Sequence, residues 1–375
     1  MDIAFVSNVV YPFVTGGAEK RIYEFGTRLV DRGHRVTVYG RQFWDGAEEM
    51  TYDGMQLRAV AKERDLYVNG RRSLGEAVGF AAALWPPLCR HIAEHDVVVT
   101  SVFPYFPVIS AATLTFPRDV PLVTTWHECW REYWWEYLGS SGIGGIAVER
   151  LVANLPQQPI AVSSLTADRV AAIGPERDRI TVVPNGIDYA RIRNTEPVAD
   201  GFDILFVGRL IEAKRVGTLL RAVASSGREP RIGVIGDGPE RDRLERLANA
   251  LDIAPQVSFL GFLEKHDRVL AHLRRADVFV SPSVREGFGL TLVEAMAADC
   301  TVVAVDHPCS AAAEVVDDAG FLVGPGITSL QRGIERALAG DRPSAPPTQR
   351  AQVYGWGRIT DKAESAYRAA ATGAW

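Results

Sequence analysis

The chain has 375 residues, of which 47% are hydrophobic and 23% are charged, and its formal net charge at pH 7 is −5. This length accommodates two α/β domains, and the composition is ordinary for a folded protein. The negative net charge argues against a nucleic-acid partner. The longest apolar run, residues 77–89, is too short to cross a bilayer and contains two prolines.

The N-terminus and the cysteines indicate the compartment. Asp2 is followed directly by an apolar run and no basic segment precedes it, so we expect no signal peptide. The four cysteines, at positions 89, 129, 300 and 309, form no Cys-x-x-Cys pair. This pattern predicts a cytoplasmic protein with neither disulfides nor a bound metal.

The first elements in chain order predict a strand–helix–strand unit. Residues 2–7 and 35–39 read as strands, and residues 18–32 read as the helix between them. The turn before this helix is a common ligand site in open α/β sheets. Gly16 and Gly17 are therefore candidate ligand contacts, with a plain tight turn as the alternative. The loop lacks the G-x-G-x-x-G pattern, which disfavours a dinucleotide site.

The next segments continue the α/β alternation. Residues 52–55 predict a hairpin turn, 73–94 and 105–116 predict helices, and 97–100 and 122–125 predict strands. The last strand ends at Trp126 and His127. A polar residue at the carboxyl end of a parallel strand faces the ligand crevice, which makes His127 a candidate site residue. A lone histidine is otherwise more often part of the surface or the core.

An unusual aromatic segment, WHECWREYWWEY, occupies residues 126–137. Five of its aromatic residues are at helical spacing and predict one helix face: Trp126, Trp130, Tyr133, Trp134 and Tyr137. We favour a core or inter-domain face. The alternative is a peripheral contact of Trp130, Trp134 and Tyr137 with a hydrophobic acceptor or with the inner membrane face, because Trp and Tyr suit membrane interfaces.

The first domain is predicted to end after strands at residues 159–163 and 180–183. Pro184-Asn185-Gly186 reads as a turn in which Asn and Gly supply positive φ angles. Residues 190–201 then read as a linker.

The second domain begins with a predicted buried strand at residues 203–208, followed by Arg209 and Lys214. Two cations just beyond a strand end can neutralise a diphosphate, although such residues are by default solvated surface charges. Residues 232–236 and 257–260 predict two further strands.

Residues 277–298 predict a strand, a loop and a helix, and the remaining chain is organised around them. The loop reads Glu286-Gly287-Phe288-Gly289, and the helix begins at Leu290. Free amides and the positive end of the helix dipole can hold an anion. Side chains lean toward a helix N-terminus, so Glu294 can point back at that anion. The pattern predicts a phosphate site with one carboxylate for a ribose diol and one for a sugar hydroxyl.

The two glutamates are separated by seven residues within EGFGLTLVEAMA. This stretch resembles the signature of the retaining glycosyltransferases of family 4. The resemblance implies the α/β GT-B fold, with two Rossmann-like domains whose parallel sheets face each other across a cleft. Residues 1–190 would form the acceptor domain, residues 200–345 the donor domain, and a helix within 351–375 would cross back to the first domain.

The resemblance also assigns roles to individual residues. It implies that the amides of Gly287, Phe288, Gly289 and Leu290 hold the donor diphosphate, together with Arg209 and Lys214. Glu294 would bind the ribose, and Glu286 would contact the transferred sugar. His127 would lie beside that sugar, and the Gly16–Gly17 loop would approach the phosphate. Residues 307–310 depart from the family's glycine-rich turn, which leaves the sugar contacts there open.

The resemblance therefore implies a hexosyltransferase that uses a UDP- or GDP-sugar and retains the anomeric configuration. The acceptor would be a glycan, a lipid-linked sugar or a small molecule, and no cofactor is expected. The chain contains no Asp-x-Asp pair, which disfavours a metal-held diphosphate. Two alternatives remain, a sugar-nucleotide epimerase on the same fold and a non-catalytic nucleotide-sugar-binding subunit. Epimerisation of the donor alone would indicate the first, and binding without transfer would indicate the second.

Overall fold

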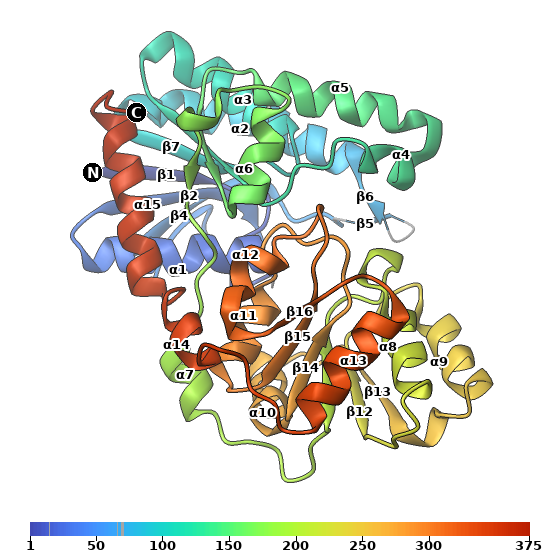
Figure 1. Cartoon of the computed structure of the whole chain (residues 1–375). Helices are drawn as coiled ribbons and strands as arrows, with labels where there is room; N and C mark the ends of the chain where they lie inside the picture. Colours follow the sequence, from blue (N-terminus) through green and yellow to red (C-terminus); the bar gives the residue numbers. More distant parts are fainter. Residues whose placement is uncertain (15, 66, 69–70) are drawn as a thin grey trace. The chain divides into compact units, whose positions relative to one another are not determined.

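The structure is a computed structural model that describes residues 1–14, 16–65, 67–68 and 71–375. It divides into two compact units (Figure 1). The first comprises Met1–Pro184 and Trp356–Trp375, and the second comprises Asn185–Gly355. Each unit is built around its own mainly parallel sheet, so the predicted α/β class with two Rossmann-like domains is confirmed.

The first unit contains an eight-stranded sheet in the order β10-β9-β8-β7-β1-β2-β4-β3. All of its strand pairs are parallel except the hairpin of β3 and β4. The strands are β1 (Asp2–Val6), β2 (Arg35–Gln42), β3 (Glu49–Tyr52), β4 (Met55–Lys62), β7 (Val97–Ser101), β8 (Leu122–Trp126), β9 (Gln158–Ala161) and β10 (Thr181–Val182). A separate antiparallel pair consists of β5 (Tyr67–Val68) and β6 (Arg71–Arg72).

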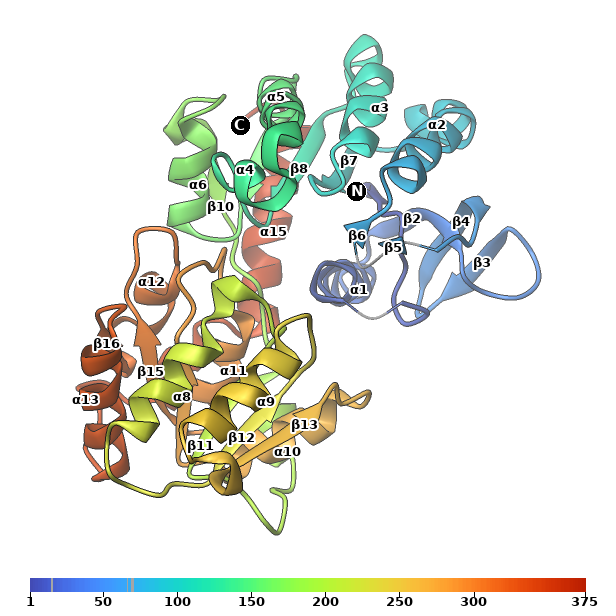
Figure 2. The same ribbon diagram turned by 90° about the vertical axis from the view of Figure 1, so that its right-hand side faces the viewer.

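Helices cover both faces of this sheet, which explains why its central strand β1 is apolar and buried from Ile3 to Val6. Ile3 and Phe5 of β1 pack in one core cluster, whereas Ala4 and Val6 pack in the other. Successive side chains of a strand point to opposite faces, so a strand covered on both sides is continuously hydrophobic. The helices are α1 (Gly17–Asp31), α2 (Leu74–His91), α3 (Phe106–Thr115), α4 (Tyr133–Leu138), α5 (Gly142–Ala153), α6 (Ser164–Ala171) and α15 (Trp356–Ala371). Figure 2 shows α2 and α3 side by side on one of these faces.

The last helix, α15, packs on the first unit although the chain before it belongs to the second. Its buried residues Trp356, Ile359, Ala363 and Tyr367 recur every three or four positions and form one apolar face. The Trp356 ring meets Phe25 of α1 edge-on at 5.6 Å between centroids. This apolar face confirms the predicted return of the C-terminal helix to the N-terminal domain.

The second unit contains a six-stranded parallel sheet in the order β13-β12-β11-β14-β15-β16. Its strands are β11 (Ile204–Val207), β12 (Ile232–Ile235), β13 (Val257–Gly261), β14 (Val278–Ser281), β15 (Thr301–Val305) and β16 (Phe321–Val323). Its helices are α7 (Tyr189–Asn194), α8 (Val216–Ala224), α9 (Arg241–Ala250), α10 (His266–Arg275), α11 (Leu290–Ala297), α12 (Ala312–Val316), α13 (Ile327–Leu338) and α14 (Pro347–Gln352). The strand order reverses direction between β11 and β14, which makes this pair the topological switch point.

The aromatic segment does not form the predicted single helix. Trp126 ends β8, and α4 begins only at Tyr133. The intervening turn contains Arg131 at a φ of 49° and is held by Glu149, whose buried carboxylate accepts hydrogen bonds from the backbone amides of Trp130 and Arg131 at 2.8 and 2.7 Å. A buried carboxylate satisfied by backbone amides favours this turn over helix continuation.

The preferred interpretation of these aromatics as core is correct for its two most buried members. Trp126 and Trp134 are 0% and 7% exposed, and the Trp134 ring packs against Gly145 of α5, where a Cβ atom would collide with it. Trp134 therefore offers little surface for a contact outside the protein. Trp130 and Tyr137 are half-buried against the same cluster. Among the described residues, no helix is both long enough and apolar enough to span a bilayer.

The predicted turn and linker after the first sheet also differ from the structure. Neither Asn185 nor Gly186 has a positive φ angle. Instead, the Ile187 amide donates to the Tyr354 carbonyl at 2.9 Å, within a parallel bridge between Ile187 and Gly355. Residues 189–194, partly within the expected linker, form helix α7, because Asp188 caps it by accepting from the Arg191 amide at 2.9 Å.

Candidate active site

The candidate site of the second unit lies at the carboxyl ends of β11 and β14. These strands are neighbours in the sheet and run parallel, so the loops that follow them emerge at the same edge. The Val284 amide donates to the Ala213 carbonyl at 3.2 Å and ties the two loops together. Ligands of open α/β sheets bind at this kind of switch point.

An ion pair joins the two loops. The Lys214 Nζ lies 2.5 Å from Glu286 Oε1, and the two side chains are 22% and 13% exposed. Arg209, in the same loop as Lys214, is exposed. The structure thus brings two predicted site residues, Lys214 and Glu286, into direct contact across 72 residues of sequence.

The start of α11 has the backbone geometry expected of an anion site. Gly289 caps the helix with a φ of 87°, a conformation that favours glycine, and no side chain caps the helix. Phe288 is only 4% exposed, and its ring meets Tyr354 edge-on at 5.4 Å between centroids. Phe288 can therefore offer a ligand its backbone but not its ring. Gly287 and Leu290, on either side of these residues, are half-buried.

Glu294 lies on the second turn of α11, and its side chain is 5% exposed. Its Oε1 is 2.9 Å from Nε2 of His266, the first residue of α10. The sequence analysis did not identify His266, because 28 residues separate it from Glu294 and no local pattern links the two. Only the packing of α10 beside α11 brings them together.

The segment that departs from the family's glycine-rich turn lies beside Glu286. The Glu286 amide donates to the Cys309 carbonyl at 3.3 Å, and the Ala311 amide donates to the Glu286 carbonyl at 2.9 Å. These two bonds form a parallel bridge between Glu286 and Ser310. The unusual sequence His307-Pro308-Cys309-Ser310 is thus fixed next to a candidate sugar-binding carboxylate.

The first-unit candidates occupy the carboxyl edge of that unit's sheet. Gly16 precedes α1 with an extended backbone at a φ of −163°, and Gly17 begins the helix with open space at its Cβ position. Thr15, between the loop and these glycines, lies outside the described residues. His127 follows β8, and its Nε2 is 3.4 Å from Ser101 Oγ at the end of the neighbouring strand β7.

The surroundings of His127 keep its ring neutral. Burial and, to a lesser extent, the nearby Arg21 charge lower the pKa of His127 to about 3. A neutral imidazole has one donor and one acceptor nitrogen, so His127 can orient a hydroxyl-bearing ligand without adding charge.

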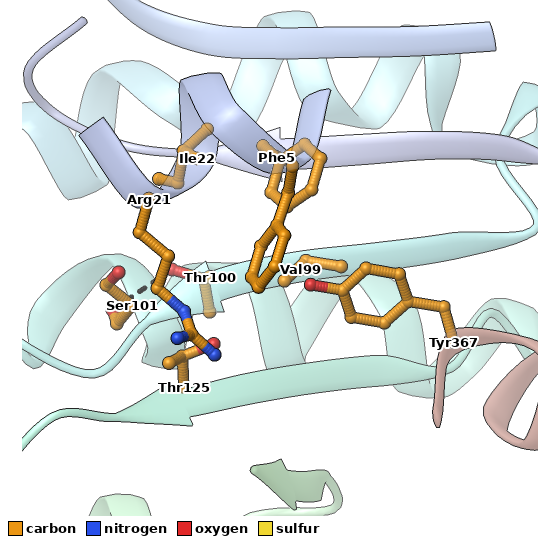
Figure 3. A pocket seen from close by; sticks show the side chains of 9 residues that line it. Phe5, Arg21, Ile22, Val99, Thr100, Ser101, Thr125 and Tyr367 are labelled. Carbon is orange, nitrogen blue, oxygen red and sulfur yellow. Dashed lines mark hydrogen bonds between the residues drawn. The ribbon is translucent and has the colours of Figure 1, made fainter. Parts of the chain in front are cut away.

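Arg21 of α1 is a buried cation that lies beside the ends of β7 and β8. Its side chain runs beside Thr100 and Ser101, with the guanidinium next to Thr125, around a small cavity of about 10 Å³ (Figure 3). Arg21 donates to the carbonyls of Val183 and Pro184 at 2.8 and 2.5 Å and stacks over Phe25 at 4.6 Å. Burial lowers the pKa of Arg21 to about 10, so the group remains charged at neutral pH. No local sequence pattern distinguishes Arg21 from the other charged residues of α1.

Comparisons with known proteins indicate the family to which the chain belongs. Residues 190–353 match the family "Glycosyl transferases group 1", and residues 15–191 match "Glycosyltransferase Family 4". The chain is 27% identical over 409 residues to glycogen synthase of Mycobacterium tuberculosis, covering 100% of this chain and 96% of that protein.

Solved structures support the fold. Sucrose-phosphate synthase from Thermosynechococcus elongatus matches with a TM-score of 0.80 and 19% identity, covering 98% of each chain. Anabaena HepE in complex with UDP and glucose matches with a TM-score of 0.74 and 21% identity, covering 98% of this chain and 100% of that one. These likenesses show the GT-B fold, and the two family matches, which together span residues 15–353, show that the chain is an enzyme belonging to glycosyltransferase family 4, of the group 1 type.

Proposed function

We propose that this enzyme transfers a sugar from a nucleoside-diphosphate donor to an acceptor hydroxyl or phosphate, with retention of the anomeric configuration. The observation that carries this proposal is the Lys214–Glu286 pair beside the uncapped start of α11, at the switch point of the second sheet. Together with Glu294 on the same helix, this arrangement supplies a cation, backbone amides and two carboxylates, which are the groups that a sugar nucleotide requires.

Each group has a distinct role in this proposal. Arg209, Lys214 and the amides of residues 287–290 stabilise the diphosphate, whose negative charge grows as the sugar departs. Glu294 accepts hydrogen bonds from the ribose hydroxyls, and Glu286 accepts one from the transferred sugar. The bond between the anomeric carbon and the phosphate oxygen breaks while the bond to the acceptor oxygen forms on the same face. The departing phosphate takes the proton of the acceptor hydroxyl.

The charge of the diphosphate is neutralised by protein groups in this scheme, without a bridging metal ion. Two cationic side chains and a helix start supply positive charge where a metal-dependent enzyme would use Mg²⁺ held by carboxylates. Because Arg209, Lys214 and the helix start carry this role in the proposal, turnover should be insensitive to a chelator.

First-unit residues act on the sugar and the acceptor in this proposal. The neutral ring of His127 hydrogen-bonds to the transferred sugar, and Gly16 and Gly17 allow backbone to approach the phosphate. Phe103, which is 40% exposed, stacks on Trp130 at 5.5 Å between centroids, at the strand edge that carries His127. This aromatic pair suits an acceptor with an apolar part, such as a lipid-linked sugar.

The test is a donor panel followed by product analysis. The crystallised HepE complex contains UDP and glucose, so UDP-sugars are the first donors to test, followed by GDP-sugars. Isothermal titration calorimetry identifies the nucleotide, and NMR of the anomeric proton of the product determines its configuration. Inverted products would overturn retention. Epimerised donor without acceptor would indicate an epimerase, and binding without transfer across a broad acceptor panel would indicate a binding subunit.

A further inference from the structure

We propose that His266 is a positioning residue that holds Glu294 in the orientation needed to bind the donor ribose. This inference rests on the proposed function, because it concerns the same nucleotide site. It adds a residue from α10, an element to which neither the sequence motif nor the proposed chemistry gives a role.

The geometry identifies a directed hydrogen bond. His266 Nε2 lies 2.9 Å from Glu294 Oε1, within the range of a strong nitrogen–carboxylate contact. A carboxylate accepts and cannot donate, so the shared hydrogen belongs to Nε2 of the imidazole. The bond therefore fixes both the tautomer of His266 and the torsion of the Glu294 side chain.

The two oxygens of the Glu294 carboxylate have different surroundings, and this difference indicates the function of the hydrogen bond from His266. Within the described residues, His266 is the hydrogen-bond partner recorded for Glu294, and it engages Oε1. A carboxylate whose side chain is only 5% exposed needs more than one donor to offset its lost hydration. A ribose diol can supply two donors, and the oxygen that His266 leaves unengaged is oriented by the bond on its neighbour.

The exposure of the two side chains indicates that His266 positions Glu294 and contributes little to the packing of the core. The His266 side chain is 40% exposed, whereas Glu294 is 5% exposed. Loss of the imidazole would remove little buried apolar surface, so the fold should tolerate it. The consequence should instead be a carboxylate that samples several rotamers, and preorganisation of a ligand-binding group is what raises affinity.

The experiment measures nucleotide affinity by calorimetry on the full chain, with UDP and GDP as probes. His266→Ala should weaken binding of the better nucleotide about tenfold, the effect of one hydrogen bond to a charged group. His266→Gln, whose side-chain amide can donate to the same oxygen, should recover most of the loss. The control is His91→Ala in the first unit, which removes a similar exposed His–Glu pair of 2.8 Å and should leave affinity unchanged.

A second ligand makes the test independent of folding. For the 2′,3′-dideoxy nucleotide there is no diol to bind, so wild type and His266→Ala should have equal affinity. In kinetics the donor KM should rise while kcat at saturating donor stays within about twofold, the pattern of lost uniform binding. Equal affinity of wild type and His266→Ala for the ribose-containing nucleotide would overturn the inference. So would an equal loss with the dideoxy ligand.

The two levels of the proposal fail in different ways. If wild type binds neither UDP nor GDP, the proposed function itself is wrong. If wild type binds one of them and Glu294→Ala loses affinity while His266→Ala does not, only the positioning role of His266 is wrong.

Discussion

Lys214 and Glu286 form an ion pair of 2.5 Å that connects the loop after β11 with the loop after β14. The pair places a cation and a carboxylate at the switch point of the second sheet, beside the start of α11. In the proposed reaction Lys214 faces the departing diphosphate, and Glu286 faces the sugar. The pair thus connects the two halves of the donor.

Removal of the cations should impair transfer. We expect Lys214→Ala and Arg209→Ala each to lower turnover about a hundredfold, because loss of one preorganised charge costs about 3 kcal/mol in the transition state. The control is Arg246→Ala, an exposed cation on α9 of the same unit, which should retain full turnover. Steady-state kinetics with the identified donor measures the effect. Turnover of both variants within twofold of wild type would contradict their assignment to the diphosphate.

The two glutamates should have separable effects. Glu294→Ala should weaken the free nucleoside diphosphate and the intact donor alike, because both carry the ribose. Glu286→Ala should spare nucleotide affinity and lower transfer, because positioning of the sugar matters only when a sugar is present. Calorimetry with the diphosphate and kinetics with the donor distinguish these results. The reversed pattern, or abolition of wild-type transfer by EDTA, would refute the site proposed here.

His127 should remain neutral in mildly acidic solution. Because burial and Arg21 lower the pKa of His127 to about 3, the imidazole should remain mostly unprotonated between pH 8 and pH 4. Long-range ¹H–¹⁵N NMR correlations of the ring nitrogens measure this directly, with His127→Gln to assign the signals. A titration midpoint near the ordinary histidine value of about 6.5 would show that the ring is solvated and charged in acid.

Two adjacent tryptophans of α4 should differ in their effect on stability. Trp134→Ala removes a side chain that is 7% exposed and should cost about 3–5 kcal/mol in the free energy of unfolding. Trp135→Ala changes a residue that is 46% exposed and should cost less than about 0.5 kcal/mol. Urea unfolding followed by fluorescence gives both values. A similar loss for both variants would mean that α4 does not pack as described.

The contacts of Glu364 on the C-terminal helix should make the free energy of unfolding depend on pH in the acidic range. Hydrogen bonds from Arg32 and then Arg368 lower the pKa of Glu364 to about 2, below its unfolded value of 4.5. The resulting stabilisation is full above the unfolded pKa and is lost as pH falls from about 5 toward 2. Wild type should therefore lose more stability between pH 7 and pH 3 than Glu364→Gln does. Urea unfolding at the two pH values measures the difference, and Glu136→Gln, an exposed carboxylate of the same unit, is the control.

Local sequence pattern predicts most of the strands and the loops that follow them. Short β-branched runs such as Val97–Ser101 and Val278–Ser281 are buried on both faces and leave an unmistakable apolar signal. Local pattern also predicts the EGFG loop, because the φ of 87° that precedes α11 favours glycine, and Gly289 occupies that position. The prediction of a single helix for the aromatic segment is wrong. The helical spacing of its rings does not reveal that the carboxylate of Glu149, which is distant in sequence, stabilises a turn there.

The sequence by itself determined the α/β alternation, the family and the identity of the charged and glycine-rich loops, because each depends on residues close together in the chain. Tertiary structure alone decided which of those groups meet. The contacts of Lys214 with Glu286 and of His266 with Glu294 depend on strand order and on the packing of α10 beside α11. Neither contact can be predicted from a repeating pattern in the sequence. A hydrogen bond between distant residues requires only one suitable side chain at each of two positions.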